Sequence, residues 1–72
     1  MRAWVVRDKS GEIDLYLDQP VKAEYYPFWE ADGTFMEILE SDLPSGINPQ
    51  WEDEEPTEIE ITIKRVKQDE TI

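Results

Sequence analysis

Carboxylates are the side chains of this chain with the widest capacity for chemistry. Of its 72 residues, 18 are Asp or Glu, whereas 7 are Lys or Arg and none is His or Cys. The densest group of acids lies in the C-terminal half and comprises Glu52, Asp53, Glu54, Glu55, Glu58 and Glu60. Paired carboxylates act as general acid and base in glycoside hydrolysis, but they need a cleft. Because so short a domain leaves little room for a cleft, we expect no enzyme and no catalytic residues.

The lack of His and Cys removes most other site chemistries. No disulfide framework, Cys/His zinc site or Ser-His-Asp nucleophile system can be built from this composition. Calcium or magnesium would require oxygen ligands in a regular arrangement. The pair Asp32–Gly33 lacks the acid spacing of an EF-hand loop, and the run Glu52–Glu55 contains no glycine to form a turn. We therefore expect neither a metal nor a cofactor.

Negative charge is concentrated in one half of the sequence. The formal net charge is -11; residues 1–36 hold seven acids and four bases, and residues 37–72 hold eleven acids and three bases. Binding to nucleic-acid phosphates depends on Lys and Arg, so direct nucleic-acid binding is not expected. An acidic surface instead steers a protein toward a basic partner, and it can imitate the phosphate backbone of DNA. The alternative is that the charge serves only to keep a small protein in solution.

These observations favour a non-enzymatic protein that binds another protein. We expect an inhibitor or DNA-mimic-like binder of a basic nucleic-acid-processing or defence enzyme. The expected partner-binding residues are Glu52, Asp53, Glu54, Glu55, Glu58, Glu60 and Tyr26. Tyr26 belongs to the aromatic run Tyr25–Trp29, in which Trp29 is expected in the core and Tyr26 at the surface, where aromatic side chains make protein contacts. The alternative function is a structural or assembly module that pairs through an exposed sheet edge.

The N-terminal third has the pattern of a β-hairpin. Residues Arg2–Arg7 are rich in β-branched and aromatic side chains, and Asp8–Gly11 is a turn signal. Residues Glu12–Asp18 then alternate strictly between apolar and polar side chains, which is typical of a half-buried strand. The alternation predicts that one face carries Ile13, Leu15 and Leu17 and the opposite face carries Asp14, Tyr16 and Asp18.

The remaining chain predicts shorter strands around a long loop. Residues 21–26 and 34–40 are expected as strands, with a helical turn at 36–39 as an alternative for the second of them. Residues 41–56 contain three prolines and the acidic run, and we expect a long surface loop held by Leu43, Ile47 and Trp51. Residues 58–63 alternate again and predict a strand, whereas a capping box from Thr57 to Glu60 leaves a helix over 57–66 as the alternative.

Together these elements predict an all-β fold, with α+β as the alternative. We expect a single small, curled antiparallel sheet of four or five strands with a long acidic loop, over residues 1–66, and a frayed polar tail over 67–72. The expected core comprises Trp4, Leu15, Leu17, Ile59 and Ile61. The longest apolar run near the N-terminus, Ala3–Val6, is too short for a signal peptide or a membrane-spanning helix, so a cytoplasmic location without membrane contact is expected.

Two stretches of the chain resemble a known group of sequences. The first is Ala3–Asp8 with Gly11, followed by Leu15–Leu17 and Pro20, and the second is Glu40–Pro44 followed by Trp51–Ile61. Together they are similar to short uncharacterised proteins of anaerobic gut bacteria and their phages, which begin with W-x-x-R-D-x-x-G and end in W-E-D-x-x-P-x-E-I-E-I or a close variant. The chain departs from that pattern between Leu43 and Trp51, where its loop is longer. The resemblance implies a bacterial or phage origin and supplies no activity.

Overall fold

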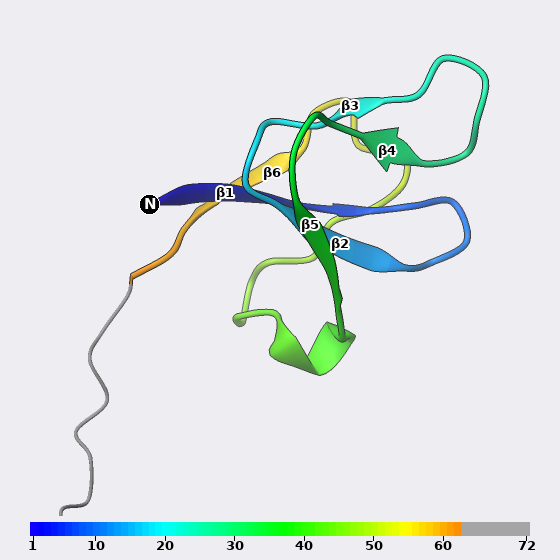
Figure 1. Ribbon diagram of the computed structural model, residues 1–72. Helices are drawn as coiled ribbons and strands as arrows, with labels where there is room; N and C mark the ends of the chain where they lie inside the picture. Colours follow the sequence, from blue (N-terminus) through cyan, green and yellow to red (C-terminus); the bar gives the residue numbers. More distant parts are fainter. Residues whose placement is uncertain (63–72) are drawn as a thin grey trace, which may run out of the picture.

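The protein is an all-β domain in the computed structural model, which describes residues 1–62 (Figure 1). A four-stranded antiparallel sheet has the order β5-β2-β1-β6, and β3 and β4 form a separate two-stranded ladder. The strands are β1 (Arg2–Arg7), β2 (Ile13–Tyr16), β3 (Val21–Lys22), β4 (Trp29–Glu30), β5 (Phe35–Ile38) and β6 (Thr57–Glu60). A single 3-10 turn, η1 (Glu40–Asp42), follows β5. The predicted all-β class is confirmed.

The predicted N-terminal hairpin forms the centre of the larger sheet. Its turn is closed by hydrogen bonds from the Asp8 N–H to the Glu12 carbonyl at 2.8 Å and from the Gly11 N–H to the Asp8 carbonyl at 2.9 Å. Gly11 has a φ of 101°, a conformation that residues with a Cβ rarely adopt. The strand β2 is shorter than predicted, because the chain leaves the ladder after Tyr16.

The strand register divides the side chains between two faces of the larger sheet. Residues paired directly across antiparallel strands share a face. The pairs Trp4–Tyr16, Val6–Asp14 and Tyr16–Phe35 therefore define one face, called here the aromatic face, whereas Val5–Leu15 and Arg7–Ile13 define the opposite, aliphatic face. The aromatic face carries Trp4, Val6, Asp14, Tyr16, Phe35 and Glu37, and the aliphatic face carries Ala3, Val5, Arg7, Ile13, Leu15 and Ile38.

Each face is covered by a different part of the chain. The β3–β4 ladder lies on one side of the larger sheet, and η1 lies on the other side (Figure 1). On the aromatic face, Trp29 from β4 forms a buried cluster with Val6 and Tyr16, and Trp51 packs against it. On the aliphatic face, Ala3, Val5 and Ile13 are buried. Both sides of β1 and β2 are therefore core, in a chain that lacks disulfides.

The burial of both faces corrects part of the predicted core. Leu17 was expected inside but is 46% exposed, because it lies beyond the end of β2. Tyr16 was expected on the solvent side but is only 3% exposed, because Trp29 covers it. Trp4 is half-buried, as are Leu15, Ile59 and Ile61. The expectation that Trp29 belongs to the core is confirmed.

The later elements agree with the sequence in kind and differ in extent. The strand expected over 21–26 is limited to β3, and the strand over 34–40 is limited to β5, with η1 after it instead of a helical turn at 36–39. Thr57–Glu60 is a strand, so the helical alternative is wrong for this part. The predicted strand end at Ile63, the domain end at 66 and the frayed tail lie outside the described residues. Across residues 1–62, the structure has no helix of the length and apolar character needed to cross a bilayer.

Candidate functional site

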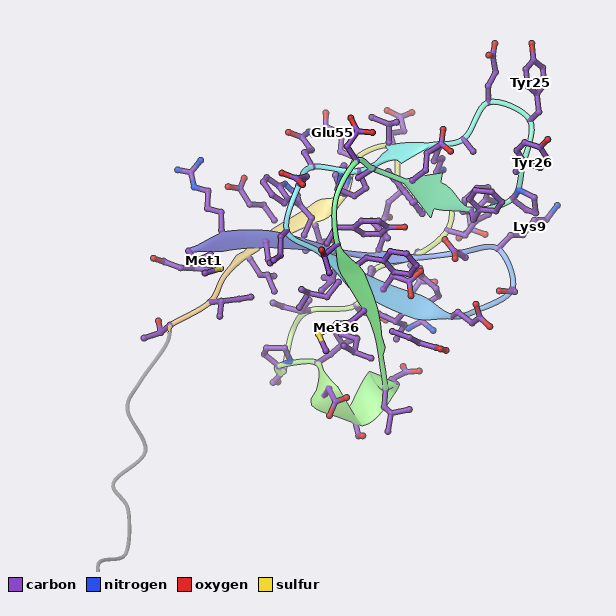
Figure 2. All side chains as sticks on the ribbon, in the orientation of Figure 1. Met1, Lys9, Tyr25, Tyr26, Met36 and Glu55 are labelled. Carbon is purple, nitrogen blue, oxygen red and sulfur yellow. The ribbon has the colours of Figure 1, made fainter. Side chains whose placement is uncertain are left out.

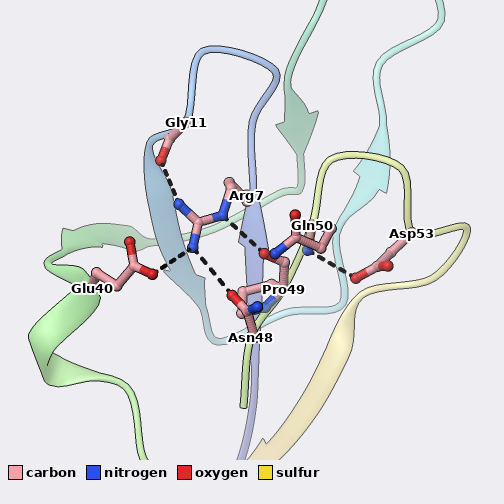
Figure 3. Close-up of polar contacts among 7 residues, drawn as sticks. All are labelled: Arg7, Gly11, Glu40, Asn48, Pro49, Gln50 and Asp53. Atoms are coloured by element: carbon pink, nitrogen blue, oxygen red, sulfur yellow. Dashed lines mark hydrogen bonds and ion pairs between the residues drawn. The ribbon is translucent and has the colours of Figure 1, made fainter. Parts of the chain in front are cut away.

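The acidic loop, Glu52–Glu55, presents three of its four carboxylates to solvent. Glu52, Glu54 and Glu55 are exposed. Asp53 instead stabilises the turn, because its Oδ2 accepts a hydrogen bond from the Gln50 N–H at 3.0 Å and its own N–H donates to the Gln50 carbonyl at 3.1 Å (Figure 3). The loop therefore offers three exposed carboxylates, and Asp53 is structural.

The other predicted contact residues do not gather around this loop. Glu58 and Glu60 lie on the edge strand β6, and the Glu58 Oε2 is 3.1 Å from the Arg2 Nε in an exposed ion pair. Tyr26 is 61% exposed and stacks on Phe28, with ring centroids 5.4 Å apart. In Figure 2, Tyr26 lies with Tyr25 at one end of the molecule, well away from Glu55. Tyr26 and the acidic loop therefore do not form one continuous contact surface.

A hollow on the aromatic face was not foreseen from the sequence. Its volume is about 380 Å³, within the roughly 300–1,000 Å³ range of small-molecule pockets. Its walls combine acids with aromatic rings, which is a pairing suited to cations. The acids are Asp8, Glu12, Asp14, Glu30 and Glu37, and the aromatic residues are Tyr16, Phe28, Trp29 and Phe35.

The back wall of the hollow is held in place by Trp29. Its backbone N–H donates to the Asp8 Oδ1 at 3.0 Å, its indole Nε1–H donates to the Arg7 carbonyl at 3.2 Å, and its carbonyl accepts from the Tyr16 hydroxyl at 2.9 Å. The Tyr16 ring also stacks on Phe35, with centroids 5.2 Å apart. These contacts join β1, β2, β4 and β5, so the aromatic wall is built on strands instead of a loop.

Asp14 is a buried acid in the wall of this hollow. Only 7% of the residue is exposed, and neighbouring carboxylates surround it. Burial, which is the largest cause, and the nearby charges of Asp8, Glu37 and Glu12 together raise the pKa of Asp14 from 3.8 to about 6. Burial and the charges of Asp14, Asp8 and Glu30 raise the pKa of the Tyr16 hydroxyl to about 12. The part of the hollow around Asp14 therefore has a strongly negative electrostatic potential at neutral pH.

Arg7, on the aliphatic face, has the opposite kind of environment. Its Nε donates to the Pro49 carbonyl at 2.9 Å and its Nη1 donates to the Gly11 carbonyl at 3.1 Å (Figure 3). Its Nη2 lies 3.5 Å from both the Asn48 Oδ1 and the Glu40 Oε2. Arg7 thus fastens the loop segment that contains Pro49 to the central hairpin.

Sequence reasoning missed Asp8 and Asp14 as site residues because it assigned Asp8 to a turn and Asp14 to a solvent-facing side. One signal was present. The turn at Asp8–Gly11 was predicted, and in the structure the hairpin that it closes pairs Val6 with Asp14, which places Asp14 beside an apolar residue on the neighbouring strand. Within residues 1–62, no group of three or more acidic side chains is arranged to hold a metal ion.

No protein-family model, no curated protein and no solved structure matches the chain. The resemblance to short proteins of gut bacteria and their phages therefore stays a prediction, and the site must be interpreted from its own chemistry.

Proposed function

We propose that this chain is a non-enzymatic binding protein that engages a partner with a basic surface. The supporting observation is the charge of the described surface. Residues 1–62 contain sixteen of the eighteen acids and only four of the seven bases. Two ion pairs form among these residues, Arg2–Glu58 and Arg7–Glu40, so most of the carboxylates lack a cationic partner within the described fold.

Such a surface favours basic partners by long-range attraction and by repulsion of acidic ones. The partner class that fits best is a basic nucleic-acid-processing or defence enzyme, which the acidic surface would occupy in place of nucleic acid. The proposal includes a cytoplasmic site of action and no direct contact with nucleic acid. The contact residues proposed are Glu52, Glu54, Glu55, Glu58 and Glu60, with Tyr26 as a separate aromatic contact.

The test uses a lysine oligopeptide of about ten residues as a basic probe, with binding followed by calorimetry as NaCl rises from about 0.05 to about 0.5 M. We expect affinity to fall steeply with salt. The double variant Glu54→Gln/Glu55→Gln should weaken binding more than Glu24→Gln/Asp32→Asn, which removes the same charge from exposed positions around the β3–β4 ladder. Equal loss in both variants would show that only net charge matters, and no binding at low salt would contradict the proposal.

A second candidate function rests on the edge strand β5. Its apolar side chains Phe35 and Met36 are 54% and 58% exposed, whereas the opposite edge, β6, carries glutamates that discourage pairing. An exposed apolar edge can accept an extended segment of a partner as an added strand. Met36, labelled in Figure 2, is the position to change. Met36→Lys should abolish the pairing of a partner strand with β5, which salt does not weaken. It should leave the salt-sensitive binding of the lysine oligopeptide intact. Light scattering and calorimetry measure the two effects.

A further inference from the structure

The hollow on the aromatic face contains a buried acid that lacks a cation. Asp14 is more than nine-tenths buried and lines the hollow. Among residues 1–62 its carboxylate takes part in neither of the two ion pairs and receives no hydrogen bond from a backbone N–H or a cationic side chain. Its polar neighbour is the carboxyl of Asp8, with which it forms a side-chain hydrogen bond and which itself accepts from the Trp29 N–H. A buried carboxylate surrounded by other carboxylates is unfavourable unless a cation joins it.

The aromatic walls show which kind of cation fits. The electron-rich faces of Tyr, Phe and Trp attract ammonium groups, and the attraction grows when water is excluded. The protein already uses this contact elsewhere: the Lys22 Nζ lies 4.5 Å from the centroid of Trp51 and 5.4 Å from that of Trp29. The acids of the hollow do not converge as metal ligands. An organic ammonium therefore matches the site better than a metal ion does.

Three of the four basic side chains in residues 1–62 are committed to other contacts, and the fourth, Lys9, is exposed in the turn next to Asp8. Arg7 projects from the aliphatic face and is bound to Pro49 and Gly11. Arg2 pairs with Glu58, and Lys22 lies over Trp51. A cation for Asp14 must therefore be looked for outside these three residues.

We propose that the hollow receives the ammonium group of a lysine side chain of the basic partner, between the carboxylates of Asp8 and Asp14 and the rings of Tyr16 and Phe35. This inference rests on the proposed function and deepens it, because it assigns one anchor contact within a broad electrostatic attraction. The hollow of about 380 Å³ has room for the four-carbon stem as well as the charged end. Glu37, paired with Asp14 across β2 and β5, adds negative charge at the same place.

The test uses n-butylammonium, which reproduces the end of a lysine side chain, and follows the indole N–H of Trp29 by NMR at constant ionic strength. We expect a saturable shift with n-butylammonium and none with 1-butanol, the neutral analogue. Asp14→Asn should weaken the binding of n-butylammonium by about tenfold or more, because it removes a charge-assisted contact. Glu24→Gln, which removes an equal charge from an exposed position outside the hollow, should leave this binding unchanged.

Two further variants keep the test decisive. If Asp14→Asn disturbs the fold, Glu37→Gln removes charge from the same hollow at an exposed residue, and Phe35→Leu removes an exposed ring; both should weaken n-butylammonium binding. Absence of a saturable shift, or equal binding in wild type and both variants, would overturn the inference. If the lysine oligopeptide still binds in that case, only the proposed lysine site in the hollow is overturned. If neither n-butylammonium nor the oligopeptide binds, the proposed function is overturned as well.

Discussion

Arg7 and Asp14 are charged side chains held against opposite faces of one sheet, and their surroundings differ in kind. Arg7 meets carbonyl oxygens of Pro49 and Gly11, the side chain of Asn48 and the carboxylate of Glu40. Asp14 meets other acids and aromatic rings. Removing one member of a set of paired buried charges destabilises the fold, whereas a buried charge that lacks partners itself raises the free energy of the folded state. The comparison gives Arg7 a structural role, whereas the binding role of the opposite face is the proposal that the following predictions test.

The largest expected effect on stability comes from a change at Trp29, which contacts the backbone of Arg7 and the side chain of Asp8. Its indole donates to the Arg7 carbonyl and its backbone N–H donates to Asp8. Trp29→Ala removes a side chain that is 3% exposed, and such a change costs about 3–5 kcal/mol of unfolding free energy. In a domain of this size that loss should unfold the protein, as measured by far-UV circular dichroism. Trp4→Ala, at a half-buried position, should cost less; equal losses would place the core elsewhere.

Arg7→Met should give the next largest loss. The change keeps most of the apolar stem but leaves the carbonyls of Pro49 and Gly11 without their donor, which costs about 2–3 kcal/mol. Urea denaturation measures this loss. Arg2→Met is the matched control, because it removes the same charge from an exposed ion pair, and it should change the unfolding free energy by only about 0.5 kcal/mol. Similar losses in both variants would show that Arg7 acts by charge alone.

Asp14→Asn should act in the opposite direction and stabilise the protein at neutral pH. The pKa of Asp14 is raised to about 6, so the ionised carboxylate is less favourable in the folded than in the unfolded chain. Removal of that charge should raise the unfolding free energy by about 1 kcal/mol, less than the full shift implies because the hollow is open to water. Glu55→Gln, from an exposed position, is the control and should change it less.

The same variant predicts a pH dependence with a definite sign. An acid with a raised folded pKa binds more protons in the folded state, so its destabilising effect develops as pH rises from about 4 to about 6 and is constant above. The advantage of Asp14→Asn over wild type should therefore shrink as pH falls from 7 toward 4. The charges of Asp8, Glu37 and Glu12 surround Asp14 and contribute to its raised pKa. An advantage that grows in acid would contradict this assignment.

The fold class could be predicted from the sequence because its signals are local. The turn Asp8–Gly11 and the alternation after it suffice to indicate a hairpin, and the β-branched residues of Thr57–Glu60 indicate the partner strand. Alternation tells which residues share a face, but it does not tell whether that face is covered. Tyr16 was assigned to the wrong environment because its cover comes from Trp29, which is distant in the sequence, and Leu17 because β2 ends before it.

The hollow was beyond prediction for the same physical reason. Asp14 becomes a buried acid only when β4 approaches β2, and that approach depends on hydrogen bonds of Trp29 with Asp8, Arg7 and Tyr16. The exposed acids Glu52, Glu54 and Glu55 were easier to foresee, since a Pro-rich loop with consecutive charges has no other place than the surface. The sequence therefore sufficed to locate the exposed acids of the loop, but not the buried acid Asp14 in the hollow.

The smallest expected effect is that of salt on stability at neutral pH. Screening weakens attraction and repulsion alike, and repulsion dominates because sixteen acids face four bases in residues 1–62. We expect added NaCl to raise the thermal midpoint slightly, by an amount equivalent to about 0.5 kcal/mol. The rise should be smaller in Asp14→Asn, where the most crowded carboxylate is absent, and unchanged in Arg2→Met, whose ion pair is exposed. KCl at the same ionic strength should act as NaCl does. A midpoint that falls with salt in the wild type would mean that the pairs of Arg2 and Arg7 outweigh the repulsion, and the contrast between the two faces would then fail.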